Sequence, residues 1–96
     1  MVEEKYKKNI ISIIRKHIPE CKIYLFGSRA KKRSHEGSDI DIAIEAKDKI
    51  GRRIIYKIKN EIEETNIPFF VDIIDLKSAD KEFKESIYKD LILWMN

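Results

Sequence analysis

Residues 39–45 read Asp-Ile-Asp-Ile-Ala-Ile-Glu, and this strict alternation constrains the fold more than any other stretch of the chain. In a β-strand, successive side chains point to opposite faces of the sheet. One face of this segment therefore carries isoleucines, and the other carries mainly carboxylates. We expect a strand whose apolar face lies in a core and whose other face presents Asp39 and Asp41 on the same side.

Elsewhere the apolar residues repeat at helical spacing or occur in short runs. The helical repeats predict helices over residues 3–18, 49–65 and 79–93. The short runs predict strands over residues 22–26 and 69–74. We expect Asp48 and Ser78 to cap the second and third helices. The order α-β-β-α-β-α predicts a small two-layer α/β (α+β) fold, in which residues 1–96 form a single domain.

Charge and composition exclude several classes of protein. The formal net charge is only +3, which does not by itself indicate direct nucleic-acid binding. No apolar run approaches the ~20 residues that span a membrane. The sequence has one cysteine and therefore no intrachain disulfide, and it starts without the pattern of a signal peptide. We expect a cytoplasmic protein.

Three aspartates have the pattern of a metal site. Asp39 and Asp41 lie two residues apart on one strand face, and their carboxylates would repel each other unless a cation lay between them. Asp72 interrupts the apolar run at 69–74, where an unpaired charge is costly. If the two strands are neighbours, the three carboxylates form one cluster. Such a cluster suits Mg²⁺, or Mn²⁺ in its place. Three carboxylates that hold two such ions form a site for in-line displacement at phosphorus.

Gly27-Ser28-Arg29 follows the first strand directly and has the pattern of a phosphate-binding turn. Glycine lets a backbone approach a phosphate closely, and the hydroxyl and backbone N–H groups of the turn can hold its oxygens. Arginine adds a fixed fork of donors. Without the turn and the third aspartate, Asp39 and Asp41 are equally well explained as the solvated face of an edge strand. Residues 31–33, Lys-Lys-Arg, fit a solvated loop or a patch that steers anions.

These residues also match a known pattern. The stretches Phe-Gly-Ser-Arg-Ala at 26–30, Ser-Asp-Ile-Asp-Ile-Ala-Ile at 38–44 and Pro-Phe-Phe-Val-Asp-Ile-Ile-Asp at 68–75 resemble the DNA polymerase β-type nucleotidyltransferase superfamily. Within it they resemble the minimal nucleotidyltransferase, or MntA-type, branch. The resemblance extends over nearly the whole chain. It implies the small nucleotidyltransferase fold, with a three-stranded mixed sheet and three helices.

The resemblance also implies roles for the site residues. The catalytic and metal-binding residues would be Asp39, Asp41 and Asp72, and the nucleotide would be held by Gly27, Ser28 and Arg29. Members of the family transfer a nucleoside monophosphate to an acceptor and release pyrophosphate. Many members of this branch are encoded beside a helical HEPN protein, which is an RNase toxin. The implied function is that of an antitoxin that transfers AMP from ATP to a tyrosine of the toxin.

Two alternatives stay open. The chain is also compatible with a nucleotidyltransferase that acts on a small molecule with the help of a separate substrate-binding subunit. It is equally compatible with an antitoxin that neutralises its toxin by binding alone. A chain of 96 residues is too short to cover a nucleotide by itself, so we expect the HEPN protein or a second copy of this chain to complete the pocket.

Overall fold

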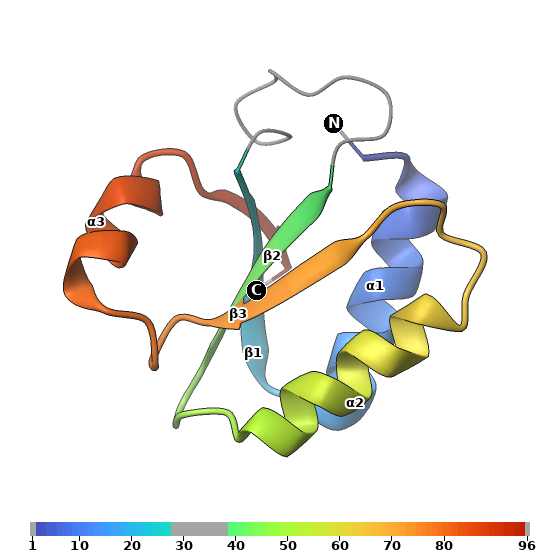
Figure 1. Cartoon of the computed structure of the whole chain (residues 1–96), viewed down its shortest axis with the longest axis horizontal. Helices are drawn as coiled ribbons and strands as arrows, with labels where there is room; N and C mark the ends of the chain where they lie inside the picture. The colour runs from blue at the N-terminus through green and yellow to red at the C-terminus, as the bar shows by residue number, and fades with distance from the viewer. Residues whose placement is uncertain (1, 28–38, 96) are drawn as a thin grey trace.

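The computed structural model describes residues 2–27 and 39–95, which form three helices and four strands (Figure 1). In chain order the elements are α1 (Glu4–His17), β1 (Cys21–Phe26), β2 (Ile40–Ala46), α2 (Arg52–Glu63), β3 (Val71–Asp75), α3 (Lys81–Tyr88) and β4 (Ile92–Met95). None of the helices described is long and apolar enough to cross a membrane.

The four strands form one mixed sheet in the order β3-β2-β1-β4. β1 pairs antiparallel with both β2 and β4, whereas β2 and β3 run parallel. A parallel pair needs a crossover connection, and α2 supplies it. The predicted α+β class, the mixed sheet and the three helices are confirmed. Among the described strands β3 is the outermost on one side, and none of them pairs with its other edge.

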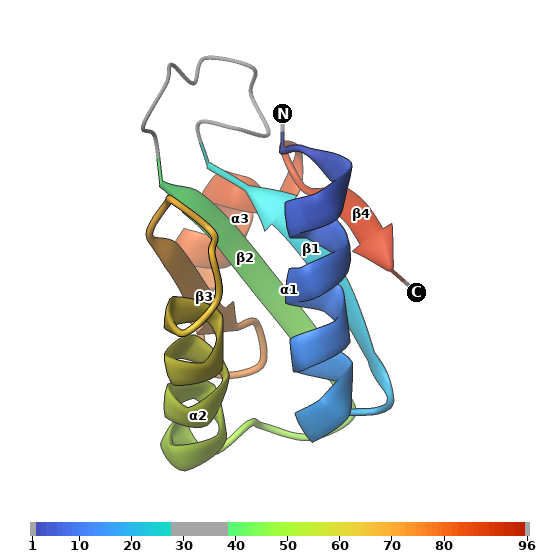
Figure 2. The same ribbon diagram turned by 90° about the vertical axis from the view of Figure 1, so that its right-hand side faces the viewer.

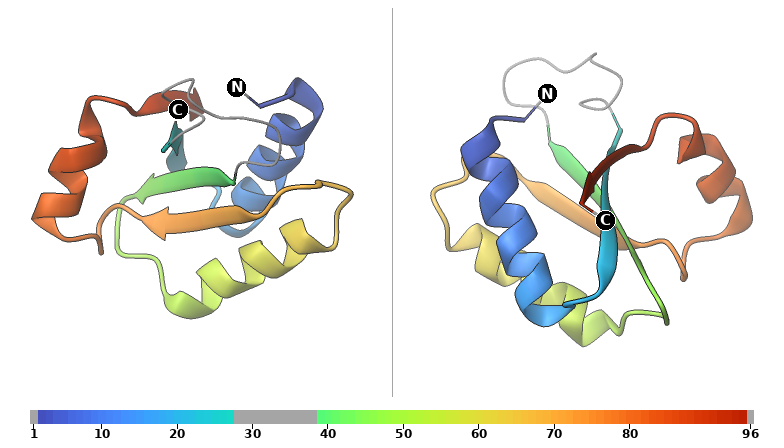
Figure 3. Two further views of the ribbon diagram at one scale, coloured as in Figure 1. Left: turned by 45° about the horizontal axis from the view of Figure 1, so that its top comes forward. Right: turned by 180° about the vertical axis from the view of Figure 1, so that it is seen from behind.

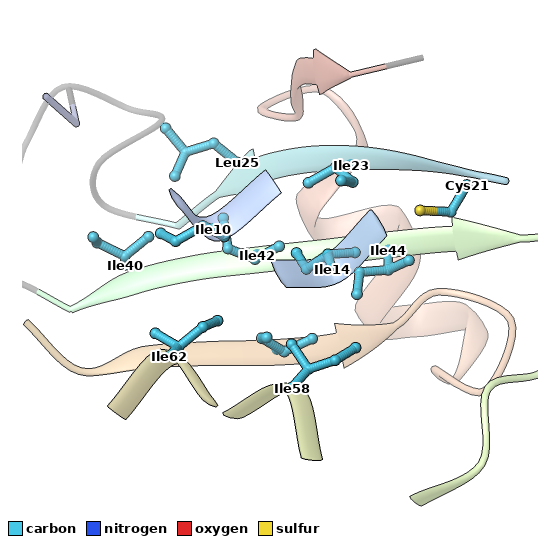
Figure 4. Close-up of a cluster of buried hydrophobic side chains, with 11 residues drawn as sticks. Ile10, Ile14, Cys21, Ile23, Leu25, Ile40, Ile42, Ile44, Ile58 and Ile62 are labelled. Carbon is cyan, nitrogen blue, oxygen red and sulfur yellow. The ribbon is translucent and has the colours of Figure 1, made fainter. Parts of the chain in front are cut away.

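One face of the sheet is covered by α1 and α2, which lie side by side across it (Figure 2). The alternation in β2 places Ile40, Ile42 and Ile44 in this core, and all three are fully buried. Isoleucines of the two helices pack against them (Figure 4). The β-branched side chains suit both the pleated strand surface and a close-packed interior.

The second face of the sheet is covered in part by α3, on the side opposite α1 and α2 (Figure 3, right). A smaller cluster of Phe26, Ala43 and Leu76 is buried there. Phe83 of α3 meets Phe26 edge-on, with ring centroids 6.1 Å apart. The aspartates of β2 and β3 belong to this same face, beyond the part that α3 packs against.

The prediction of a three-stranded sheet is wrong, and the helix predicted over residues 79–93 is present but shorter than predicted. The helix ends at Tyr88, and residues 92–95 form the fourth strand, β4. The apolar residues Phe83, Ile87 and Leu91 repeat at helical spacing, which hides the change of structure. β4 pairs with β1 and places Ile92 and Trp94 against the main core. Pairing along an otherwise open sheet edge therefore outweighs the local helical pattern.

The predicted caps of the second and third helices are also wrong. The N-cap positions are occupied by Gly51 and Asp80, and neither helix has a side-chain cap. Ser78 instead donates its hydroxyl to the carboxylate of Asp75, at 2.7 Å. Asp75 also accepts the backbone N–H groups of Ile50 at 2.8 Å and Lys77 at 3.1 Å. This buried carboxylate thereby joins the end of β3 to the loop before α2.

Asp75→Ala is expected to lower the free energy of unfolding by about 2–3 kcal/mol, because it leaves two backbone N–H groups and a hydroxyl without their charged acceptor. Urea denaturation measures the change. Asp48→Ala, an exposed aspartate in the same loop, serves as the control and is expected to have little effect. Equal stability of the Asp75 variant and the native chain would contradict this role.

Lys16 and His17, at the end of α1, both contact the carboxylate of Glu61 on α2, at 2.8 and 2.5 Å. The hydrogen bonds from Lys16 and His17 lower the pKa of Glu61 below its ordinary 4.5. A lowered pKa in the folded state means that the contribution to stability is present above pH 4.5 and is lost as the pH falls through the folded-state pKa. The contact therefore joins the two helices at neutral pH.

Glu61→Gln is expected to lower the free energy of unfolding at neutral pH, since the charged acceptor of both bonds is lost. The difference from the native chain should shrink as the pH falls well below 4.5, where the native carboxylate is protonated as well. Chemical denaturation over a pH series tests this, with Glu63→Gln on the same helix as the control. If the difference in free energy of unfolding between the native chain and Glu61→Gln grew as the pH fell, the expected direction of the pH dependence would be wrong.

Candidate active site

β1 ends and β2 begins at the same end of the sheet (Figure 1). Asp39 and Asp41 lie at the start of β2, and Asp72 lies near the start of β3. In the parallel pairing of β2 with β3, Asp41 stands directly opposite Asp72. In the antiparallel pairing of β1 with β2, Asp41 stands opposite Phe26, the last residue before Gly27. Asp39 lies just before β2 and is exposed. The neighbouring strands assumed in the sequence analysis are thus present, and they set Asp41 beside Asp72, with Asp39 two residues before Asp41.

Gly27 has a backbone conformation that suits glycine, with φ at +78°. A Cβ atom at this position would lie 2.3 Å from Oδ2 of Asp41, far inside van der Waals contact. The absence of a side chain at residue 27 therefore lets the backbone of Gly27 lie directly against the carboxylate of Asp41. The predicted phosphate-binding residues Ser28 and Arg29 and the basic residues 31–33 lie outside the described residues.

Burial and like charges both act on the central carboxylate of the site. Burial raises the pKa of Asp41, and the negative charges of Asp72 and then Asp39 raise it further. Both effects disfavour the ionised carboxylate. A cation placed among the three groups would reverse the repulsion. The site therefore favours binding of a cation. Without a cation, ionisation of the Asp41 carboxyl group is costly.

The third carboxylate has a partner that the sequence analysis did not identify. Nζ of Lys59, on α2, lies 3.0 Å from Oδ1 of Asp72. Within residues 2–27 and 39–95, no three acidic, histidine or cysteine side chains converge as they stand on a point that could hold a metal ion. Lys59 lies on α2 between the core residues Ile58 and Ile62. Its position in the helical pattern does not predict a contact with Asp72, which belongs to the opposite face of the sheet.

The three aspartates nevertheless fit a divalent metal ion. All are oxygen donors, which Mg²⁺ and Mn²⁺ prefer. Asp39 and Asp72 are exposed and accessible to an incoming ion. The repulsion that raises the pKa of Asp41 is the signal expected of carboxylates that share a cation. Asp41 and Asp39 would hold such an ion from β2, and Asp72 would join them from β3.

Two open hollows lie along β3, one toward the end of the strand and one at its start, where the aspartates are. The larger, of about 710 Å³, runs along the free edge of β3 between α2 and α3. The smaller, of about 280 Å³, includes Pro68 and Phe70. Lys59 lines both. Phe70 precedes Asp72 by two residues and is 77% exposed, an unusual position for a large apolar ring. The site is thus open and accessible to a large substrate.

Carboxylates paired across adjacent strands, with a glycine packed against one of them, suit a protein that binds a divalent cation and acts on phosphate groups. Residues 8–95 match the model of the family described as "Polymerase beta, Nucleotidyltransferase", and the chain belongs to this family. The resemblance noted in the sequence is therefore confirmed at the level of the family.

Two curated relatives have similar sequences. The chain is 28% identical over 78 residues to the probable protein adenylyltransferase MntA of Haemophilus influenzae, which covers 81% of this chain and 68% of that protein. It is 35% identical over 74 residues to the protein adenylyltransferase MntA of Shewanella oneidensis, which covers 76% of this chain and 52% of that protein. The chain thus spans about half the length of the Shewanella relative.

Solved structures show the same fold. A toxin–antitoxin crystal structure with AMP-PNP contains a chain with a TM-score of 0.81 and 28% identity, over 94% of this chain and 73% of the other. A tri-AMPylated HEPN toxin of Shewanella oneidensis in complex with its MNT antitoxin gives a TM-score of 0.78 at 25% identity. That match covers 99% of this chain and 73% of the other.

Proposed function

We propose that this chain is a Mg²⁺-dependent nucleotidyltransferase that moves AMP from ATP to a tyrosine of a HEPN-type toxin and so acts as the toxin's antitoxin. The carrying observation is the register that sets Asp41 opposite Asp72, with Gly27 packed against Asp41. Both curated relatives are named protein adenylyltransferases. The similar solved structures are a toxin–antitoxin with AMP-PNP and a tri-AMPylated HEPN toxin with its antitoxin.

The proposed metal ligands are Asp39, Asp41 and Asp72. A bound Mg²⁺, or Mn²⁺ in its place, would offset the charge that develops at phosphorus, and a second ion would be compatible with three carboxylates. The metal would also remove the repulsion that raises the pKa of Asp41. Gly27 lets its own backbone lie against the carboxylate of Asp41, and Gly27, Ser28 and Arg29 are proposed to hold the nucleotide's triphosphate.

In the transfer, the acceptor oxygen forms a bond to the α-phosphorus of ATP, and the bond from that phosphorus to the bridging oxygen breaks. Pyrophosphate leaves, and the acceptor's proton must be removed. Asp72 is the proposed acceptor of that proton, because it is the most accessible of the carboxylates that face one another across the strands. The chain's other contribution is to hold the reacting groups in line.

We also propose that residues 1–96 act as one domain and that the partner completes the pocket. β1 and β4, the first and last of the described strands, pair in the same sheet, which supports the proposal of one domain. The exposure of Asp39 and Asp72 supports the second, because transfer to water competes with transfer to the acceptor unless the site is covered. The toxin that brings the tyrosine can provide this cover, as can a second copy of the chain.

The test is intact-mass spectrometry of the HEPN protein incubated with this chain, ATP and Mg²⁺. We expect the mass of the HEPN protein to rise by whole AMP units and its RNase activity to fall. Asp39→Asn should prevent both changes while still binding the HEPN protein. Full neutralisation by Asp39→Asn, without any added mass, would instead favour an antitoxin that acts by binding alone. Transfer to a small molecule would favour the separate-subunit alternative.

A further inference from the structure

The ion pair between Lys59 and Asp72 crosses from one face of the sheet to the other. Lys59 belongs to α2, which packs with Ile58 and Ile62 into the main core. Asp72 points to the opposite face, since its neighbours Val71 and Ile73 belong to the core below α2. The lysine reaches the carboxylate around the outside of the sheet. This route exists only because β3 is the outermost strand.

The pair also places a cation on Asp72, the carboxylate that stands opposite Asp41. One of its carboxylate oxygens lies 3.0 Å from the ammonium group of Lys59. Within the described parts of the chain, no three acidic, histidine or cysteine side chains are grouped so that they could hold a metal ion. The exposed fractions of the two side chains are 37% for Lys59 and 57% for Asp72, so water competes for both partners. An ion pair with this exposure is weak, so either side chain can exchange its partner for another charged group.

We propose that Lys59 is a positioning residue that occupies a carboxylate oxygen of Asp72 until a nucleotide arrives, so that the divalent ion enters together with the polyphosphate rather than before it. This inference rests on the proposed function of the site and assigns to that function an order of binding and a further residue. Lys59 would release Asp72 and contact the polyphosphate when the nucleotide is bound.

The physical basis is competition between cations for one carboxylate. A free divalent ion must displace the ammonium group of Lys59 and then remain close to its positive charge, which weakens its binding. A polyphosphate changes this balance, because its oxygens give the ammonium group a new anionic partner. A lysine suits such an exchange, since its charge is compact and its stem is flexible. Metal and nucleotide should therefore strengthen each other's binding to an equal extent.

The test measures Mn²⁺ binding by electron paramagnetic resonance, with and without AMP-PNP, and without any transfer reaction. Without nucleotide, Lys59→Met is expected to bind Mn²⁺ about three- to tenfold more tightly than the native chain, because the competing cation is gone. The gain in Mn²⁺ affinity that AMP-PNP gives should shrink by at least the same factor. Lys57→Met, an exposed lysine on the same helix, should match the native chain.

Lys59→Arg keeps a cation at this position and should keep weak Mn²⁺ binding in the absence of nucleotide. Circular dichroism and thermal unfolding of each variant confirm that the fold is retained. Equal Mn²⁺ affinity of the native chain and Lys59→Met without nucleotide would overturn the inference and leave the proposed function intact. A native chain that binds no Mn²⁺ even with AMP-PNP would overturn both, so the two failures are distinguishable.

Discussion

Asp41→Asn is expected to reduce AMP transfer by at least about 10³-fold while leaving the chain as stable as the native protein or more stable. The loss of transfer follows from the central position of Asp41, opposite Asp72 and against Gly27. The gain in stability follows from its charge. Burial and the neighbouring carboxylates raise the pKa of Asp41, so its ionised form opposes folding. An amide of nearly the same shape removes that repulsion.

Measuring stability as a function of pH shows whether the ionised Asp41 carboxylate destabilises the fold. A carboxyl group whose pKa is higher in the folded state than in the unfolded state binds more protons when folded. Its contribution to stability is complete below the unfolded value of 3.8 and falls as the pH rises through the folded-state pKa. The native chain should show this loss in thermal unfolding, and Asp41→Asn should not. A variant that unfolds more easily than the native chain at neutral pH would contradict this account.

Gly27→Ala is the second substitution with a large expected effect. A non-glycine residue at a φ of +78° costs about 1–2 kcal/mol, and the added Cβ would meet Oδ2 of Asp41 at 2.3 Å. Either the turn or the carboxylate must move. We expect the free energy of unfolding to fall by about 1–3 kcal/mol. Transfer should fall by about 10²-fold, since a displacement of ~1 Å at a reacting centre has an effect of that size.

A double-mutant cycle separates the two causes. In an Asp41→Ala background, the carboxylate that the new Cβ would meet is absent, so Gly27→Ala should lower stability by less than it does in the native chain. Gly51→Ala is the matched control. It has an ordinary φ of −67° and nothing within 4 Å of an added Cβ, so a change of less than about 1 kcal/mol is expected. Equal effects of Gly27→Ala in both backgrounds would show that its contact with Asp41 is unimportant.

Much of the fold could be predicted because single strands and helices carry local patterns. The alternation at 39–45 predicted β2 and its buried isoleucines, and the structure confirms both. The last strand could not be predicted in this way. Ile92 to Met95 follow a helical repeat without a glycine or proline, and their pairing with β1 depends on a strand some seventy residues away. Contacts of such long range leave no local signal.

The residues of the candidate site also fall into two groups, those that local spacing predicts and those whose position depends on contacts distant in the sequence. The spacing of Asp39 and Asp41 predicts that they share one strand face. In the structure β2 begins at Ile40, so Asp41 lies in the strand and Asp39 just before it. The position of Asp72 depended on which strands are neighbours, and the parallel register of β2 and β3 confirms the expected pairing. Lys59 could not be found from the sequence, since its contact requires knowing that β3 is an edge strand and that α2 lies beneath it.

The most direct test of the central claim is transfer of label from α-labelled ATP in a lysate of the source cells, with Mg²⁺ and the purified chain. The account predicts label on one small protein with the native chain and none with the Asp39→Asn, Asp41→Asn double variant. Label on the same protein with both would show that these carboxylates are not the catalytic residues. No label with any of the four ribonucleoside triphosphates would contradict the proposed transferase activity itself.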